Sequence, residues 1–302
     1  MKPIINLNSI SDIGKFIQQG SVKHPLVAII DFSKVDEYVE AGTRISCNFY
    51  SVMFKNYCIN NMKYGRQNYD FQEGSLVCMA PKQIVEMDSE VEKRDDIMGW
   101  GLFFHPDLVR NTTLGIKMKD YTFFSYETAE ALHLSEKEKK TLYECILNIE
   151  NELNENIDNH SQNLIVSNIE LLLNYCSRYY GRQFITRKNS NRDIVAQVET
   201  TLHEYFNSDL LKDKRLPSVS YLADKVNLSP NYLSDLLKKE TGMNAKDHIH
   251  YLLIEEAKNV LLGTSKSISE IAYDLGFEYP QYFSKLFKQK TGNTPQEFRN
   301  LN

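Results

Sequence analysis

Two segments near the C-terminal end of the chain repeat one pattern of apolar and polar positions. The first starts at Val219 and reads VSYLADKVNLSPNYLSDLLKKETG, and the second starts at Ile268 and reads ISEIAYDLGFEYPQYFSKLFKQKTG. Their offset is 49 residues before an internal turn and 50 residues after it. Self-similarity at one offset indicates a duplicated supersecondary unit.

Each copy predicts a helix, a tight turn and a second helix. In the second copy, Ser267 and Glu270 have the spacing of a capping box at a helix start. Gly276 can adopt the positive φ that ends a helix, and Pro280 can open the next helix because its missing N–H does no harm there. Gly292 then ends that helix. The first copy has Asn227, Pro230 and Gly242 at the corresponding places.

The second helix of each copy has an apolar face and a polar face. In the last helix, Phe283, Leu286 and Phe287 recur at helical spacing on one side, and the opposite side carries no acid. A helix-turn-helix offers such a polar face to the DNA major groove, where lysine, glutamine, asparagine and serine can read base edges. We therefore expect DNA contacts from Ser229, Asn231, Tyr232, Ser234, Asp235, Lys238, Gln281, Tyr282, Ser284, Lys285 and Lys288.

A helical pattern also joins the two copies. The stretch AKDHIHYLLIEEAKNVLLG has apolar residues at helical spacing and ends at Gly263. A helix of this length would hold two recognition helices apart so that they enter successive major grooves. The alternative is a pair of amphipathic hairpins with solvated polar faces, and the matched duplication disfavours it.

The segment Ser267–Arg299 resembles the AraC/XylS family of bacterial transcription regulators. It contains the elements I-A-x-x-x-G-F, Y-F-S-K-x-F-K and G-x-T-P-x-x-F-R in order. The resemblance extends over about 195–300 and implies a domain of seven helices, with recognition helices at 230–241 and 280–290. Two positions depart from the family, which often has arginine where this chain has Asp235 and Leu253. Both departures suggest that the second copy binds DNA more firmly, or that binding needs a dimer.

The N-terminal half has a strand-like pattern from Pro25 to about Phe124. Four short apolar or alternating runs, broken by Gly, Asn and Asp, carry it: LVAIIDF, ISCNFYSVMF, GSLVCMAP and IMGWGLFF. The stretch YDFQEGSLVCMAPKQIVEM resembles a cupin-type strand pair, which implies a cupin-like β-barrel that serves as a sensor. Such a barrel has room for one small-molecule effector. Residues that could line it are Tyr50, Trp100, Phe103 and Phe104, and core packing is the alternative role for each.

Catalysis is not expected from this half. Its histidines are widely spaced, and none falls in the strand where a metal cupin would carry its ligands, so no cofactor or metal is predicted. A nucleophile pair of Cys78 and His105 is conceivable, but a buried small hydrophobe and a strand-end residue are the simpler readings. The histidines in question are His24, His105, His133 and His160.

Two amphipathic helices are predicted after the barrel, at 135–155 and 161–180. Ser135 and Glu138 form a further capping box at the first helix. The second helix has a rich apolar stripe from Ile169 to Leu173 that needs cover. In the resembled family such helices often pair two subunits, so a homodimer is favoured over packing on the chain's own barrel.

The distribution of charge along the chain indicates the domain organisation. The 302 residues carry a net charge of −5, with 25 acids against 18 bases in residues 1–181 and near balance, 15 against 14, in residues 191–302. The polar, basic stretch between them is read as a linker, although a solvated loop within one domain is the alternative. We expect a sensor and dimerisation domain at 1–181, a linker at 182–192 and a DNA-binding domain at 193–302.

The five scattered cysteines and the absence of an apolar signal core or membrane span favour a cytoplasmic protein.

The sequence thus predicts an α+β protein of two domains, a cupin-like barrel with two helices and an all-α double helix-turn-helix domain. Its expected function is sequence-specific regulation of transcription, and its expected partners are promoter DNA, a second copy and, for an activator, RNA polymerase. Two alternatives stay open. One is a protein-docking module without a ligand, and the other is a cupin enzyme fused to a DNA-binding tail.

Overall fold

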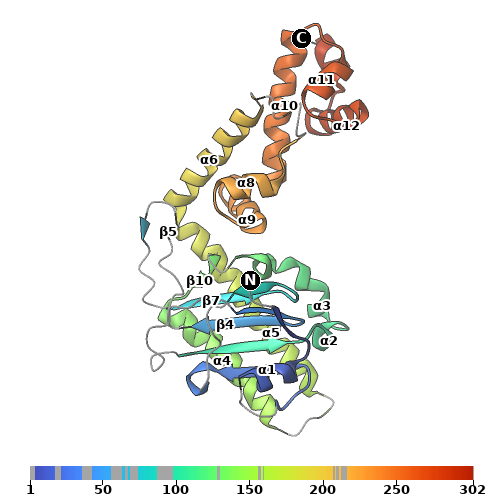
Figure 1. Ribbon diagram of the computed structural model, residues 1–302. Coiled ribbons are helices and arrows are strands. Elements are labelled where there is room, and N and C mark those ends of the chain that lie inside the picture. Colours follow the sequence, from blue (N-terminus) through green and yellow to red (C-terminus); the bar gives the residue numbers. More distant parts are fainter. Residues whose placement is uncertain are drawn as a thin grey trace. The chain divides into compact units, whose positions relative to one another are not determined.

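The computed structural model describes residues 4–17, 22–35, 43–55, 63–64, 67–68, 74–86, 98–127, 130–155, 158, 160–206, 208, 211 and 216–301. The chain forms two compact units, Met1–Thr186 and Arg187–Asn302. The first is β-rich with packed helices and the second is helical, which confirms the α+β class (Figure 1). Within the described part of the chain, no helix is long and apolar enough to cross a bilayer.

The strands of the N-terminal unit pair into three sheets. A five-stranded sheet has the order β10-β7-β4-β9-β2, a three-stranded sheet has the order β1-β3-β8, and β5 pairs with β6. The described strands do not join into a closed barrel, so the coarser α+β description holds here. The strands are β1 (Ile4–Leu7), β2 (Val27–Asp31), β3 (Arg44–Cys47), β4 (Tyr50–Lys55), β5 (Lys63–Tyr64), β6 (Gln67–Asn68), β7 (Ser75–Met79), β8 (Ile84–Glu86), β9 (Gly99–Phe104) and β10 (Leu132–His133).

The centre of the large sheet is β4, which pairs antiparallel with both β7 and β9. Its register sets Tyr50 opposite Phe104 and Phe54 opposite Trp100, and these rings contact one another across the strands. Because side chains alternate along a strand, Phe103 lies on the other face, where it joins a core cluster around the first helix. The sheet is therefore covered by apolar residues on both faces.

Short helices flank these strands. Thr112 caps one of them through its side chain, which accepts a hydrogen bond from the Gly115 N–H. They are α1 (Ile10–Phe16), α2 (Pro106–Val109) and α3 (Thr113–Lys117), with 3-10 turns at Phe32–Lys34, Met118–Asp120 and Thr122–Ser125.

Two long helices, α4 (Glu136–Asn154) and α5 (Ser161–Thr186), pack against each other in this unit. The predicted capping box at the start of α4 is present, with the Glu138 carboxylate accepting from the Ser135 N–H at 2.9 Å. Most residues of the two apolar stripes are buried inside the unit, including Ile169, Leu172 and Leu173, whereas Leu164 is exposed. The chain's own core therefore covers the stripe whose exposure favoured a dimer.

The segment 182–192, expected as a linker, is helical on either side of the unit boundary. Arg182 donates to the Glu138 carboxylate and to the His133 carbonyl, and the buried Gln183 bonds the His133 N–H and the Ala131 carbonyl. These long-range bonds hold the end of α5 on the sheet. A local pattern of polar residues does not reveal them, which is why the segment read as a linker.

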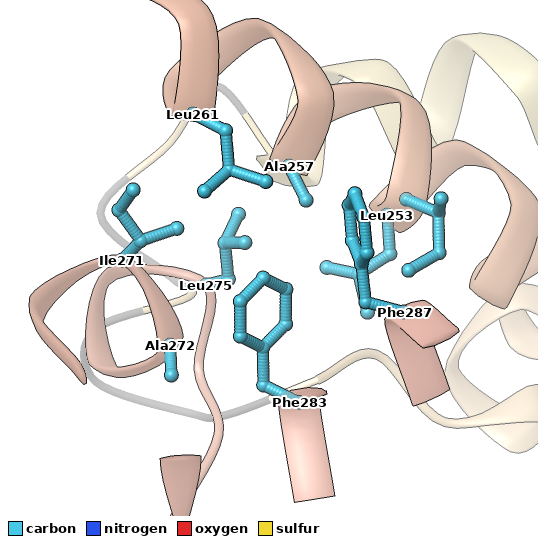
Figure 2. Close-up of a cluster of buried hydrophobic side chains, with 9 residues drawn as sticks. Leu253, Ala257, Leu261, Ile271, Ala272, Leu275, Phe283 and Phe287 are labelled. Carbon is cyan, nitrogen blue, oxygen red and sulfur yellow. The ribbon is translucent and has the colours of Figure 1, made fainter. Parts of the chain in front are cut away.

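The C-terminal unit is built around α10. Figure 1 shows α8 and α9 at one end of this helix and α11 and α12 along its other end. Residues of α10, α11 and α12 form one apolar core cluster, drawn in Figure 2. The helices are α6 (Lys188–Phe206), α8 (Val219–Lys225), α9 (Pro230–Thr241), α10 (Ala245–Gly263), α11 (Ile268–Asp274), α12 (Pro280–Thr291) and α13 (Pro295–Leu301).

Candidate nucleic-acid interface

The two helical hairpins, α8–α9 and α11–α12, have the same turn. Asn227 and Gly276 both have a positive φ, 54° and 80°. Just after them, the Leu228 N–H donates to the Ala223 carbonyl at 3.0 Å and the Phe277 N–H donates to the Ala272 carbonyl at 2.9 Å. Bonds of this kind satisfy carbonyls at the end of a helix and redirect the chain. The duplicated sequence therefore produces a duplicated backbone.

The ends of α9 and α12 are also equivalent. Gly242 and Gly292 are left-handed C-caps, with φ of 81° and 84°. In each copy the preceding threonine hydroxyl bonds back into its helix, Thr241 to the Leu237 carbonyl and Thr291 to the Phe287 carbonyl, both at 2.8 Å. The identical Thr-Gly pairs are thus explained by one helix stop used twice.

The apolar face of α12 fixes the orientation of that helix. Phe283 and Phe287 are fully buried, and Figure 2 shows them pointing toward Leu253 and Ala257 of α10 and toward α11. Their rings are 5.7 Å apart in an edge contact, which adds to the stability of the cluster. With this face buried, the opposite face of α12 must point outward.

The outward face of α12 is polar and basic. Gln281, Tyr282, Lys285 and Lys288 are exposed, and Ser284 is half-buried beside them. No residue of α12 is acidic, so this face combines hydrogen-bonding groups with positive charge alone. A face of that composition fits base edges and phosphates of a major groove.

The outward face of α9 has mixed charge. Asn231 and Lys238 are exposed, together with Lys239, whereas Asp235 is half-buried. Ser234 is used inside the fold, because its hydroxyl accepts from the Ala245 N–H at 3.3 Å, at the start of α10. The two recognition surfaces therefore differ in electrostatic character, and α12 is the more attractive to a polyanion.

Two residues expected to contact DNA hold α9 in place. Ser229 is buried and caps α9, its hydroxyl accepting from the Tyr232 N–H. Tyr232 is fully buried among the core residues of α9, so its ring has no surface to offer to DNA. Both Tyr232 and its counterpart Tyr282 were among the expected DNA contacts. Tyr282 does lie on the outward face of its helix, with 59% of its surface exposed.

Polar contacts tie α9 and α12 to the start of α10. The Thr241 hydroxyl and His248 Nε2 are 2.7 Å apart, and Lys290 pairs with Asp247 at 2.9 Å. Burial lowers the pKa of His248, although Glu199 and Asp247 oppose the shift. The hydrogen bond from Lys290 lowers the pKa of Asp247. These contacts connect the C-terminal ends of both recognition helices to one element.

Sequence reasoning missed Tyr279 and the role of α6. Tyr279 is the N-cap of α12 and is 49% exposed, close to the polar face. In α6, the buried Asn191 donates to the Glu240 carboxylate at 3.1 Å, which anchors α6 to α9. The sequence does show an aromatic residue, Tyr279, directly before Pro280. The role of α6 could not be predicted, because the bond between Asn191 and Glu240 joins residues 49 positions apart.

In the N-terminal unit, the residues expected to line a ligand cavity are divided between two faces of the sheet. Tyr50, Trp100 and Phe104 lie on one face of the sheet, and Phe103 lies on the opposite face. They contribute to two core layers, so they do not line one common cavity.

The conceivable nucleophile pair also has separate surroundings. Burial, together with the neighbouring Cys176, raises the pKa of the Cys78 thiol far above its ordinary value, which disfavours the reactive thiolate. His105 caps α2, and its Nδ1 accepts from the Asp107 N–H at 3.2 Å. The described residues contain no group of His, Cys, Asp and Glu side chains arranged to hold a metal ion.

The C-terminal helices are similar to known proteins. A family model described as a helix-turn-helix domain matches residues 222–301. The chain is 28% identical over 128 residues to the uncharacterized HTH-type transcriptional regulator YijO of Escherichia coli, and the matched region covers 42% of this chain and 42% of YijO. It is 41% identical over 124 residues to the uncharacterized transcriptional regulatory protein YesN of Bacillus subtilis, which covers 40% of this chain and 34% of YesN.

Among solved structures, the C-terminal domain of AraT, a response regulator from Geobacillus stearothermophilus, is 29% identical to this chain. The structural match covers 36% of this chain and 85% of the AraT domain, with a TM-score of 0.32. The chain spans about two-fifths or less of the length of the curated relatives YijO and YesN.

Proposed function

We propose, from the AraC-type helix-turn-helix domain at its C-terminus, that the chain is a sequence-specific DNA-binding regulator of transcription. One observation carries this function. Two equivalent helices, α9 and α12, each bury an apolar face and both contact α10, and α12 presents an acid-free polar face outward. A fold that repeats one recognition element fits a duplex, which repeats its groove every turn of about 34 Å.

In this function α9 and α12 enter successive major grooves. The proposed contacts are made by the outward residues, with Ser229 and Ser234 supporting α9 from within and Tyr232 in the core. From α9 they are Asn231, Asp235 and Lys238, and from α12 they are Gln281, Tyr282, Ser284, Lys285 and Lys288. Promoter DNA is the partner, in the cytoplasm, and an activating role would add RNA polymerase.

The N-terminal unit is proposed to be a cupin-like sensor. Its five-stranded and three-stranded sheets, with the apolar cluster beside α1, support the β-rich character of this module, and a small molecule is its proposed effector. An effector regulates only if it binds two states of the protein with different affinity, because equal binding shifts no population. Catalysis has no part in this function.

A homodimer is proposed through a different face of α5 from the one expected. Leu164, Leu171 and Ile185 are exposed, and they recur at spacings of seven and fourteen residues. Seven residues are close to two helical turns, so the three side chains form one line along the helix. Sedimentation velocity of full-length protein should give a dimer that Leu171→Asp converts to a monomer, whereas Tyr143→Asp, at an exposed site on α4, should not.

The decisive test is selection of bound duplexes from a random DNA pool by full-length protein at near-physiological salt. We expect enrichment of a site with two elements in adjacent major grooves, and log affinity for it should fall linearly with log salt concentration. No enrichment, or binding to another protein with little salt dependence, would point instead to a docking module.

A further inference from the structure

Tyr279 and Tyr282 form an exposed aromatic pair at the start of α12. Their ring centroids are 5.7 Å apart at an interplanar angle of 85°, which is an edge-to-face contact. The rings keep 49% and 59% of their surface exposed. Exposing two large aromatic surfaces side by side is unfavourable in water, so the pair is expected to be covered in the working state of the protein.

The side chain of Tyr279 does not cap α12. Tyr279 is the N-cap of α12, yet no side-chain hydrogen bond caps this helix. The first copy shows what a capping residue does at this place, since Ser229 bonds the Tyr232 N–H and Tyr232 is fully buried. Tyrosine is a poor capping residue, and an ordinary Ser, Thr, Asp or Asn would stabilise the helix better.

The position of the pair points to the bases. In a helix-turn-helix the N-terminal residues of the second helix contact base edges. Gln281 lies between the two tyrosines, and Lys285 follows about one turn after Gln281, both exposed. The rings therefore belong to the same surface as the polar side chains proposed to read DNA.

The chemistry of the rings selects one base. In the major groove only thymine carries an apolar group, its C5-methyl, and apolar side chains contact it. We propose that Tyr279 and Tyr282 contact thymine C5-methyl groups in the half-site read by α12, which rests on the DNA-binding function proposed above. The α9 half-site lacks this readout, because Tyr232 is in the core.

The experiment uses full-length protein and the duplex selected from the random pool. Each thymine of the site is replaced in turn by deoxyuridine, which removes the methyl group and keeps every hydrogen-bonding atom. We expect about a fourfold loss of affinity at one or two thymines of one half-site, the factor that burial of one methylene-sized group supplies.

Protein variants assign that loss to the pair. Tyr282→Ala and Tyr279→Ala should each reduce the thymine-over-uracil preference, and Tyr282→Phe, which keeps the ring, should retain it. Tyr251→Ala is the matched control, since Tyr251 is 50% exposed on α10. All three sites are at the surface, so each variant should keep the fold, and far-UV circular dichroism checks this.

The outcomes separate the two levels of the proposal. Three outcomes would overturn the aromatic readout and leave DNA binding intact. The enriched site contains no thymine in either half, or it tolerates uracil at every position. In the third outcome, the thymine preference persists in Tyr282→Ala and Tyr279→Ala. A pool that yields no enriched duplex would remove the DNA-binding function and this inference with it.

Discussion

Lys285 lies on the exposed face of α12, and its neighbours on that face carry no negative charge. If its ammonium group contacts a base, Lys285→Ala should weaken specific binding by about 1–3 kcal/mol. Lys239→Ala, which removes an equal charge from α9, should lower specific and non-specific affinity by similar factors. Fluorescence anisotropy with the selected duplex and a scrambled duplex measures both, and equal affinity of Lys285→Ala and the parent would exclude Lys285 from the interface.

Asp235 is the only acid among the proposed DNA contacts. A carboxylate near phosphates is repelled, so Asp235→Ala should bind DNA at least as tightly as the parent protein and discriminate less between sequences. Asp224→Ala, at an exposed site on α8, is the charge-matched control. A large loss of specific affinity in Asp235→Ala alone would mean that the carboxylate accepts a hydrogen bond from cytosine N4.

Single residues show where sequence reasoning succeeds and where it stops. Helix starts and stops were predictable, because Pro, Gly and capping boxes act locally, as at Ser267 and Gly292. The opposite environments of Tyr232 and Tyr282 were not, although both follow a proline by two residues. The second turn is one residue longer and begins α12 with Tyr279 in place of a capping serine, and a pattern of spacings does not report how that changes the ring's surroundings.

At the scale of elements, the contact between α9 and α10 includes a buried histidine that responds to pH. His248 is buried on α10 and contacts the Thr241 hydroxyl at the end of α9. Because burial lowers its pKa in the folded protein, the unfolded chain binds a proton more readily. The stabilising contribution of neutral His248 is full above the unfolded pKa of about 6.5 and is lost as the pH falls toward the folded pKa.

The urea midpoint of full-length protein, followed by far-UV circular dichroism, should therefore decrease between pH 7.5 and pH 5. His248→Gln should flatten part of this dependence and lower the midpoint at pH 7.5. Burial also lowers the pKa of His24 and of His250, so some dependence should persist in the variant. A pH profile identical to that of the parent would contradict the role assigned to His248.

Elements with a strong local pattern were predicted well, and those held by distant contacts were not. The helices α8, α9, α10, α11 and α12 follow from apolar spacing and from their caps. The segment 182–192 is polar and basic, yet it is helical because Arg182, Gln183 and Asn191 each bond a residue 44 or more positions away. The same reasoning explains the β-rich unit, where strand runs were predicted and their pairing into sheets was not.

At the scale of the whole molecule, the unit boundary gives a sharp choice of fragment. The buried Arg187 and Asn191 belong to the C-terminal unit, and Asn191 bonds Glu240 in α9. A fragment of residues 187–302 should fold and bind the selected duplex more weakly than full-length protein, because it lacks the proposed dimer interface. A fragment of residues 193–302 should be less stable by about 1 kcal/mol or more, since Glu240 loses its partner.

Thermal unfolding of the two fragments, with full-length protein as the reference, measures this difference. Equal stability of both fragments would show that the first turn of α6 adds nothing to the helix-turn-helix domain. A 187–302 fragment that binds DNA as tightly as full-length protein would count against a required dimer.

The continuous helix α10, 19 residues or about 28 Å long, has a consequence for the DNA as well. Because α10 packs against both helical hairpins and does not stretch, the distance between α9 and α12 is constant. A duplex whose grooves do not match that distance must itself twist or bend, at a cost that depends on its base steps. In the proposed complex, the stiffness of the bases between the two half-sites would then affect the affinity without direct readout of those bases. Promoters with identical contacted bases and different spacers should be bound unequally, and the spacer becomes a means of grading the response.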